Sequence, residues 1–178
     1  MHPVLLVPGL GNSGPLHWQR LWQAELGNAA RAVEQADWDR PDFADWVERL
    51  EHAVASMPQA PVLAAHSLSC ALVVHWAARH PRSIAGALLV APADVDSDAH
   101  TPPETRAFRP MPAAPLAFPS IVVASSDDPY VTHERAAVMA EHWGSRFVNI
   151  GAAGHINSAA GFGEWPLGRL LLDELRRG

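Results

Sequence analysis

The 178-residue sequence predicts an α/β protein of three layers, in which a mostly parallel central sheet lies between helices. Short runs of Val, Leu and Ile alternate along the chain with longer segments of helical period, which is typical of a parallel sheet buried on both faces. Apolar residues make up 48% of the chain and charged residues 18%, so there is enough material for a core. The length is short for two independent cores, and we expect a single domain over residues 1–178.

Five apolar runs have the length and composition of buried strands. They are Val4–Val7, Val62–Ala65, Ala87–Val90, Ile121–Ala124 and Arg146–Ile150. A weaker run at Arg31–Glu34 predicts a sixth strand.

The segments between these runs can form helices that cross back over the sheet. Pro15–Leu26 begins with a proline, which suits a first helical turn, and Asp42–Ser56 places its apolar residues on one face. The other predicted helices are Leu68–Arg79, His133–Trp143 and Trp165–Arg177. Pro92–Pro119 contains seven prolines and is therefore expected to be a long loop.

Charge and composition exclude several kinds of partner. A formal net charge of -6 argues against nucleic acid, whose binding needs clustered Lys and Arg. The N-terminus lacks a positively charged segment and no apolar run could span a bilayer, so we expect no signal peptide, no membrane partner and a cytoplasmic protein. Cys70, the single cysteine, fits a reducing compartment and is expected to be a packed, inert thiol.

Metal sites are not expected either. The segment from Asp94 to Asp98 begins like a calcium loop, but Ala99 occupies the glycine position and Thr105 the position of the bidentate glutamate. We interpret it as a solvated acidic loop. His133 and Glu134 lack the second histidine of a zinc protease helix.

Ser67 lies where the Val62–Ala65 strand turns into a helical pattern. A sharp turn at this point projects a serine hydroxyl above the sheet, with the helix N-terminus behind it. The usual pattern for such a nucleophile elbow is G-x-S-x-G, whereas Ala65 and Ser69 stand here in place of the glycines. The alternative is that Ser67 merely caps the helix that begins at Leu68.

A base and an acid follow the serine in the order that a Ser-Asp-His triad requires. The strand Ile121–Ala124 is followed by the pair Asp127 and Asp128, and the last strand leads through a glycine-containing loop to His155. Spacing does not separate the two aspartates. One would hold the imidazole and the other would cap the following turn.

The loop after the first strand supplies the remaining site candidates. We expect the oxyanion to be held by the backbone N–H groups of Leu68 and Leu10. Asn12, His17 and Trp18 are candidate substrate-binding residues near the mouth of this site.

These features together resemble the small serine hydrolases without a cap domain, the family that includes retinoblastoma-binding protein nine. The resemblance extends from the Val-Pro-Gly start, through Ala-Asp-Trp-Asp-Arg-Pro at residues 36–41, to Asp-Asp-Pro-Tyr-Val and Gly-His. It implies a minimal α/β-hydrolase-type fold without a lid domain. It also implies that the acid is the aspartate directly before the proline, Asp128, with Ser67 and His155 as nucleophile and base. The family commonly has glycine at the position of Ala65.

The sequence thus predicts a serine hydrolase that needs no cofactor and acts on an ester or related small acyl substrate through an acyl-enzyme. Two alternatives remain. Gly9, Gly11 and Gly14 match the G-x-G-x-x-G pattern of dinucleotide-binding proteins, with Glu34 about twenty residues further on. The fold could also serve as a non-catalytic interaction module.

Overall fold

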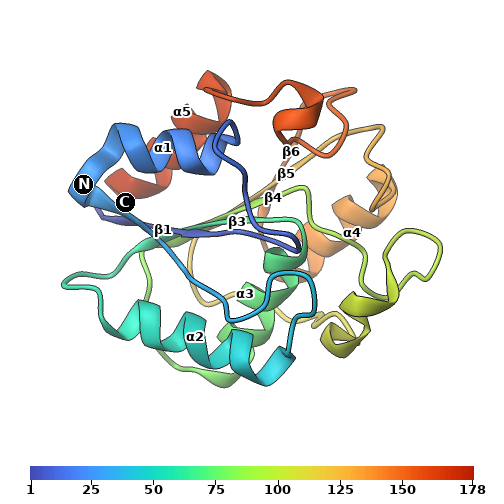
Figure 1. Ribbon diagram of the computed structural model, residues 1–178, viewed down its shortest axis with the longest axis horizontal. Coiled ribbons are helices and arrows are strands. Elements are labelled where there is room, and N and C mark those ends of the chain that lie inside the picture. The colour runs from blue at the N-terminus through green and yellow to red at the C-terminus, as the bar shows by residue number, and fades with distance from the viewer.

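A parallel sheet of six strands forms the middle layer of the computed structural model, which describes residues 1–178 (Figure 1). Its spatial order is β2-β1-β3-β4-β5-β6, and every pair of neighbours is parallel. The strands are β1 (Val4–Val7), β2 (Ala30–Ala32), β3 (Val62–His66), β4 (Gly86–Val90), β5 (Ser120–Ala124) and β6 (Arg146–Asn149). All six predicted strands are present; the weakest prediction, Arg31–Glu34, is displaced along the chain by one residue at its start and two at its end.

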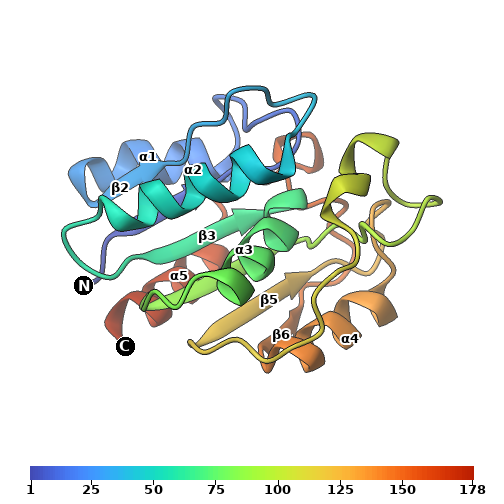
Figure 2. The ribbon, with the colours of Figure 1, turned by 90° about the horizontal axis from the view of Figure 1, so that it is seen from below.

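Helices cover both faces of this sheet. α2 (Phe43–Ala55), α3 (Leu68–Arg79) and α4 (His133–Trp143) pack on one face, and α1 (Trp18–Leu26) and α5 (Pro166–Arg177) on the other (Figures 1 and 2). Alternate strand residues enter the two apolar cores. Leu5 packs on the side of α2 and α3, whereas Leu6 packs on the side of α1 and α5. This two-sided burial explains why the four inner strands, β1, β3, β4 and β5, are almost entirely apolar runs.

The predicted start of α1 was wrong. Pro15 does not occupy the first turn; it lies in a turn, and the helix begins at Trp18. His17 is the N-cap residue, and its Nδ1 accepts a hydrogen bond from the backbone N–H of Gln19 at 3.2 Å. A capping side chain, rather than the proline, therefore determines where the helix starts.

Pro92–Pro119 is a long loop, as predicted, and contains one short 3-10 helix at Pro103–Phe108. Its first part, including the 3-10 helix, lies beyond the carboxyl ends of the strands, toward which the arrows of β3 and β5 point in Figure 2, and its last part runs back to the start of β5. No further domain is inserted between the strands, so the fold is minimal and lacks a lid domain.

The acidic segment of this loop is less solvated than predicted. Asp94 is buried and accepts a hydrogen bond from Arg135 at 3.1 Å, and the same guanidinium contacts Asp96 at 2.7 Å. Only Asp98 has a largely exposed side chain. The first two aspartates therefore anchor the loop to α4 through Arg135.

No group of three or more histidine, cysteine or acidic side chains is arranged to hold a metal ion. None of the helices has both the length and the apolar character needed to cross a membrane. Cys70 is buried, and this burial raises the pKa of its thiol. The thiol is therefore protonated and shielded from reagents at neutral pH.

Candidate active site

Ser67 occupies a sharp turn between β3 and α3. Its backbone has φ 58° and ψ −123°, a conformation that residues other than glycine rarely adopt. The side chain makes no capping hydrogen bond to α3, so the interpretation of Ser67 as a simple helix cap is wrong. Its Oγ instead lies 2.8 Å from Nε2 of His155.

The two positions that depart from the usual elbow are both buried. Ala65 is fully buried in the core beside α3. Ser69 is also fully buried, and its hydroxyl donates to the carbonyl oxygen of Pro8 at 2.5 Å. The hydroxyl that replaces a glycine therefore links the first turn of α3 to the loop after β1.

The close approach in this elbow requires a glycine at position 9. A Cβ on Gly9 would lie 2.8 Å from the carbonyl oxygen of His66 and 3.1 Å from Cβ of Ser67. Gly14, in contrast, has nothing within 4 Å of its Cβ position. The glycines of the G-x-G-x-x-G pattern thus have different surroundings, and α1 begins only at Trp18 rather than at the end of the pattern. Pyrophosphate binding needs a helix that begins directly at the end of the glycine loop, and no helix begins there.

We predict that Gly9→Ala destabilises the protein and that Gly14→Ala does not. The added methyl group must displace backbone in the elbow, which costs about 1–3 kcal/mol of unfolding free energy. Urea denaturation of both variants measures the difference. Equal stability of the two variants would contradict the close approach at Gly9.

His155 lies in the loop after β6 and contacts both Ser67 and Asp128. Its Nδ1 lies 3.0 and 2.9 Å from the two carboxylate oxygens of Asp128, whose side chain is fully buried. An ionised carboxylate can only accept, so the proton of the neutral imidazole is on Nδ1 and Nε2 is free to accept from the hydroxyl of Ser67. The backbone N–H of Tyr130 donates to the same carboxylate at 2.9 Å.

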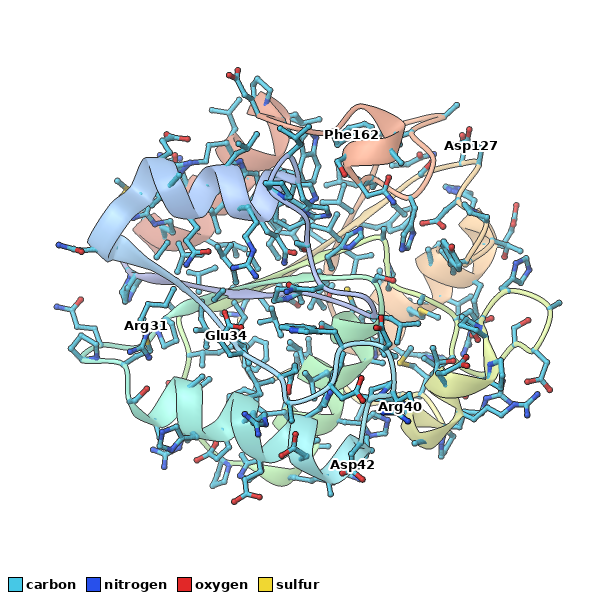
Figure 3. All side chains as sticks on the ribbon, in the orientation of Figure 1. Arg31, Glu34, Arg40, Asp42, Asp127 and Phe162 are labelled. Carbon is cyan, nitrogen blue, oxygen red and sulfur yellow. The ribbon has the colours of Figure 1, made fainter.

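Asp127 has a different role from its neighbour. Its Oδ1 accepts from the backbone N–H groups of Ala153 and Gly154, each at 2.8 Å, and from the hydroxyl of Ser125 at 2.6 Å. These hydrogen bonds, that of Ser125 foremost, lower the pKa of the Asp127 carboxyl. Asp127 lies at the tip of the loop after β5, beside the loop that carries His155 (Figure 3). It holds that loop rather than the turn that follows it in sequence.

A pocket of about 270 Å³ opens at Ser67. Leu10 and Leu68, whose N–H groups are the predicted oxyanion donors, both line it, on the side of the loop after β1 and of the elbow. The nitrogen of Leu68 lies 3.4 Å from the Cβ position of Gly9, so the two loops are in contact there. No Lys, Arg, Asp or Glu lines the pocket.

The three predicted substrate-binding residues have different positions. Asn12 lines the pocket, although its Oδ1 already accepts from the N–H of Ser13 and from Arg20. His17 also lines the pocket and is buried; this burial, followed by the nearby His155, lowers its pKa to about 4. His17 is therefore neutral at pH 7.

Trp18, in contrast, does not line the pocket. It is fully buried in the core, with its ring packed against Trp22 and Trp165. Its Nε1 donates to the carbonyl oxygen of Ile156 at 2.9 Å. The predicted place at the pocket mouth is wrong because the helix begins at Trp18 and turns this ring inward.

Several residues that line the pocket were not predicted from the sequence. They are Thr101, Thr105, Tyr130, Asn157 and Ser158. All follow the carboxyl ends of β4, β5 or β6, the edge at which parallel sheets bind their ligands. That position along the chain is the signal that could have found them.

Comparison with known proteins identifies the family. Residues 4–174 match the family model described as serine hydrolase. The chain belongs to the serine hydrolase family. This hydrolase is also similar in structure to a YdeN-like hydrolase from Pectobacterium atrosepticum, with a TM-score of 0.87 and 32% identity over 98% of this chain and 90% of that one.

More distant structures share the fold of this hydrolase. The ydeN gene product of B. subtilis has 19% identity and a TM-score of 0.79, with all of both chains covered. A thermophilic esterase from Thermogutta terrifontis has 18% identity and a TM-score of 0.71, covering 99% of this chain and 90% of that one. The comparison with curated proteins found no match.

The family and these neighbours confirm an α/β-hydrolase fold and an enzyme with hydrolase activity. They favour neither the dinucleotide-binding alternative nor the non-catalytic module.

Proposed function

We propose that this hydrolase cleaves esters or related acyl compounds through Ser67, His155 and Asp128, with an acyl-enzyme intermediate. The supporting observation is the unbroken series of hydrogen bonds from the buried carboxylate of Asp128, through the imidazole, to a serine on a strained turn. A serine hydroxyl is a weak nucleophile at neutral pH and needs such a base to act.

In the proposed reaction, Nε2 of His155 carries the proton of Ser67 to the leaving group. As Ser67 Oγ attacks the acyl carbonyl, its proton passes to Nε2 of His155, and Asp128 stabilises the imidazolium that forms. The N–H groups of Leu10 and Leu68 hold the oxyanion of the tetrahedral intermediate. The imidazolium then gives the proton to the leaving group, and a water molecule, activated in the same way, releases the acyl group from Ser67.

Labelling by a fluorophosphonate tests this proposal. We expect the wild-type protein to form one covalent adduct, which mass spectrometry of its peptides places on Ser67. Ser67→Ala should abolish the adduct, whereas Ser83→Ala, which changes an exposed serine away from the pocket, should retain it. No labelling of the folded wild type, or an adduct on another serine, would contradict the proposal.

The size of the pocket favours short acyl groups. A volume of about 270 Å³ lies below the range of typical pockets for drug-sized ligands. We predict that kcat/KM for p-nitrophenyl acetate or butyrate exceeds that for the octanoate by about tenfold or more. A preference for the long chain would contradict this prediction.

The uncharged lining adds a second test of acyl specificity. Because no cation lines the pocket and His17 is neutral, a carboxylate on the acyl chain would lose its hydration without gaining a counterion. We expect the anionic p-nitrophenyl monoester of glutaric acid to react about tenfold or more slowly than the neutral pentanoate of equal length. Equal rates would show that the acyl group does not enter this pocket.

A further inference from the structure

Two ring N–H groups hold successive carbonyl groups of the loop that carries His155. Nε2 of His66 lies 2.9 Å from the backbone oxygen of His155, and Nε1 of Trp18 donates to the backbone oxygen of Ile156, also at 2.9 Å. Ile156 has φ 47°, in the left-handed region that β-branched residues avoid. The loop is therefore held in a conformation that it would not adopt alone.

The contact with His66 fixes the protonation of that ring. A carbonyl oxygen only accepts, so the proton of neutral His66 is on Nε2. The ring is buried between two other imidazoles, with centroids 4.8 Å from those of His17 and His155. Burial, followed by these two neighbours, lowers the pKa of His66 well below its ordinary value. His66 is thus a neutral donor and not a second base.

We propose that His66 and Trp18 are positioning residues for catalysis, which hold the backbone of His155 and Ile156 so that the imidazole lies between Ser67 and Asp128. This inference depends on the proposed function. The two contacts of the imidazole, at 2.8 Å to the serine and 2.9 Å to the carboxylate, leave little room for movement of the loop. A misplacement of about 1 Å in such a site costs on the order of a hundredfold in rate.

Paired substitutions of His66 test whether an N–H group at the position of its Nε2 is needed. The side chain of glutamine is long enough to place its amide nitrogen at the position of Nε2. The side chain of asparagine is too short to do so. We expect His66→Asn to lower both kcat for p-nitrophenyl acetate and the rate of fluorophosphonate labelling by about tenfold to a hundredfold. His66→Gln should recover most of this loss.

Trp18→Phe provides an independent variant, since it removes the indole N–H and keeps an aromatic ring in the core. We expect a loss of labelling rate and of kcat of about tenfold. This variant tests the proposal even if His66→Asn does not fold.

The chain offers a matched control for each substitution. Nε2 of His75 donates to the carbonyl oxygen of Phe108 at 2.7 Å, and Nε1 of Trp143 donates to that of Pro112 at 2.8 Å. Both rings are buried and neither lines the pocket at Ser67. His75→Asn and Trp143→Phe should lower the melting temperature but leave the labelling rate of the folded protein unchanged.

Three results would overturn the inference. They are a folded His66→Asn with the labelling rate of the wild type, a folded His66→Gln no faster than His66→Asn, and a folded Trp18→Phe with the wild-type labelling rate. In each case the wild type would still be labelled at Ser67, so the proposed function would stand. A wild type that no fluorophosphonate labels would instead contradict the proposed function.

Discussion

Replacement of Ser67 by alanine is expected to lower kcat/KM for p-nitrophenyl acetate by about a thousandfold or more. Alanine removes the nucleophilic oxygen that lies 2.8 Å from His155 and leaves the imidazole and the proposed oxyanion donors in place. The remaining rate would then come from these groups acting on water. Steady-state hydrolysis by the purified variant, with its fold checked by circular dichroism, measures the loss.

A double variant of Ser67 and His155 tests whether the two residues act together. If Ser67 and His155 act as one unit, His155→Gln alone should cause a loss of similar size, and the double variant should be no slower than either single variant. Losses that multiply in the double variant would show that the two residues act independently. Near-normal turnover of either single variant would contradict the proposed mechanism.

Asp128→Asn is expected to lower kcat by about a thousandfold or more at pH 7 to 8. The carboxylate holds the proton of His155 on Nδ1, whereas an amide can donate to Nδ1 and thereby move the proton to Nε2. A protonated Nε2 cannot accept from Ser67. The loss should appear in kcat more than in KM, because Asp128 does not line the pocket.

Asp127→Asn is the matched control for this substitution. It changes the adjacent residue by the same atoms, but the amide oxygen can still accept from the N–H groups of Ala153 and Gly154. We expect a loss of activity of no more than about tenfold. A larger loss in Asp127→Asn than in Asp128→Asn would contradict the choice of acid.

Local sequence patterns were sufficient for most of the fold. The bounds of α3 and α4 agree with the predicted Leu68–Arg79 and His133–Trp143, because apolar residues at helical spacing and clear end signals lie within each segment. The prediction failed at the start of α1, where the sequence favours Pro15 as the first turn but the helix begins at Trp18. The cap there is His17, which accepts a hydrogen bond from the N–H of Gln19, and histidine is not among the residues that usually signal a helix start.

The sequence by itself determined the alternation of strands and helices and the order of Ser67, an acidic pair and His155 after three of the strands. These features depend on residues close together in the chain. The tertiary structure alone shows that Asp128 contacts the imidazole of His155 while Asp127 contacts the backbone of its loop, and that Trp18 lies in the core rather than at the pocket mouth.

The tertiary structure also revealed the hydrogen bond between His66 and the backbone of His155, residues separated by 89 positions in the chain. Such contacts depend on how distant loops meet above the sheet. Composition and spacing carry no information on such contacts, so Ser67 could be predicted from the sequence, whereas the hydrogen bonds of His66 and Trp18 to the loop of His155 could not.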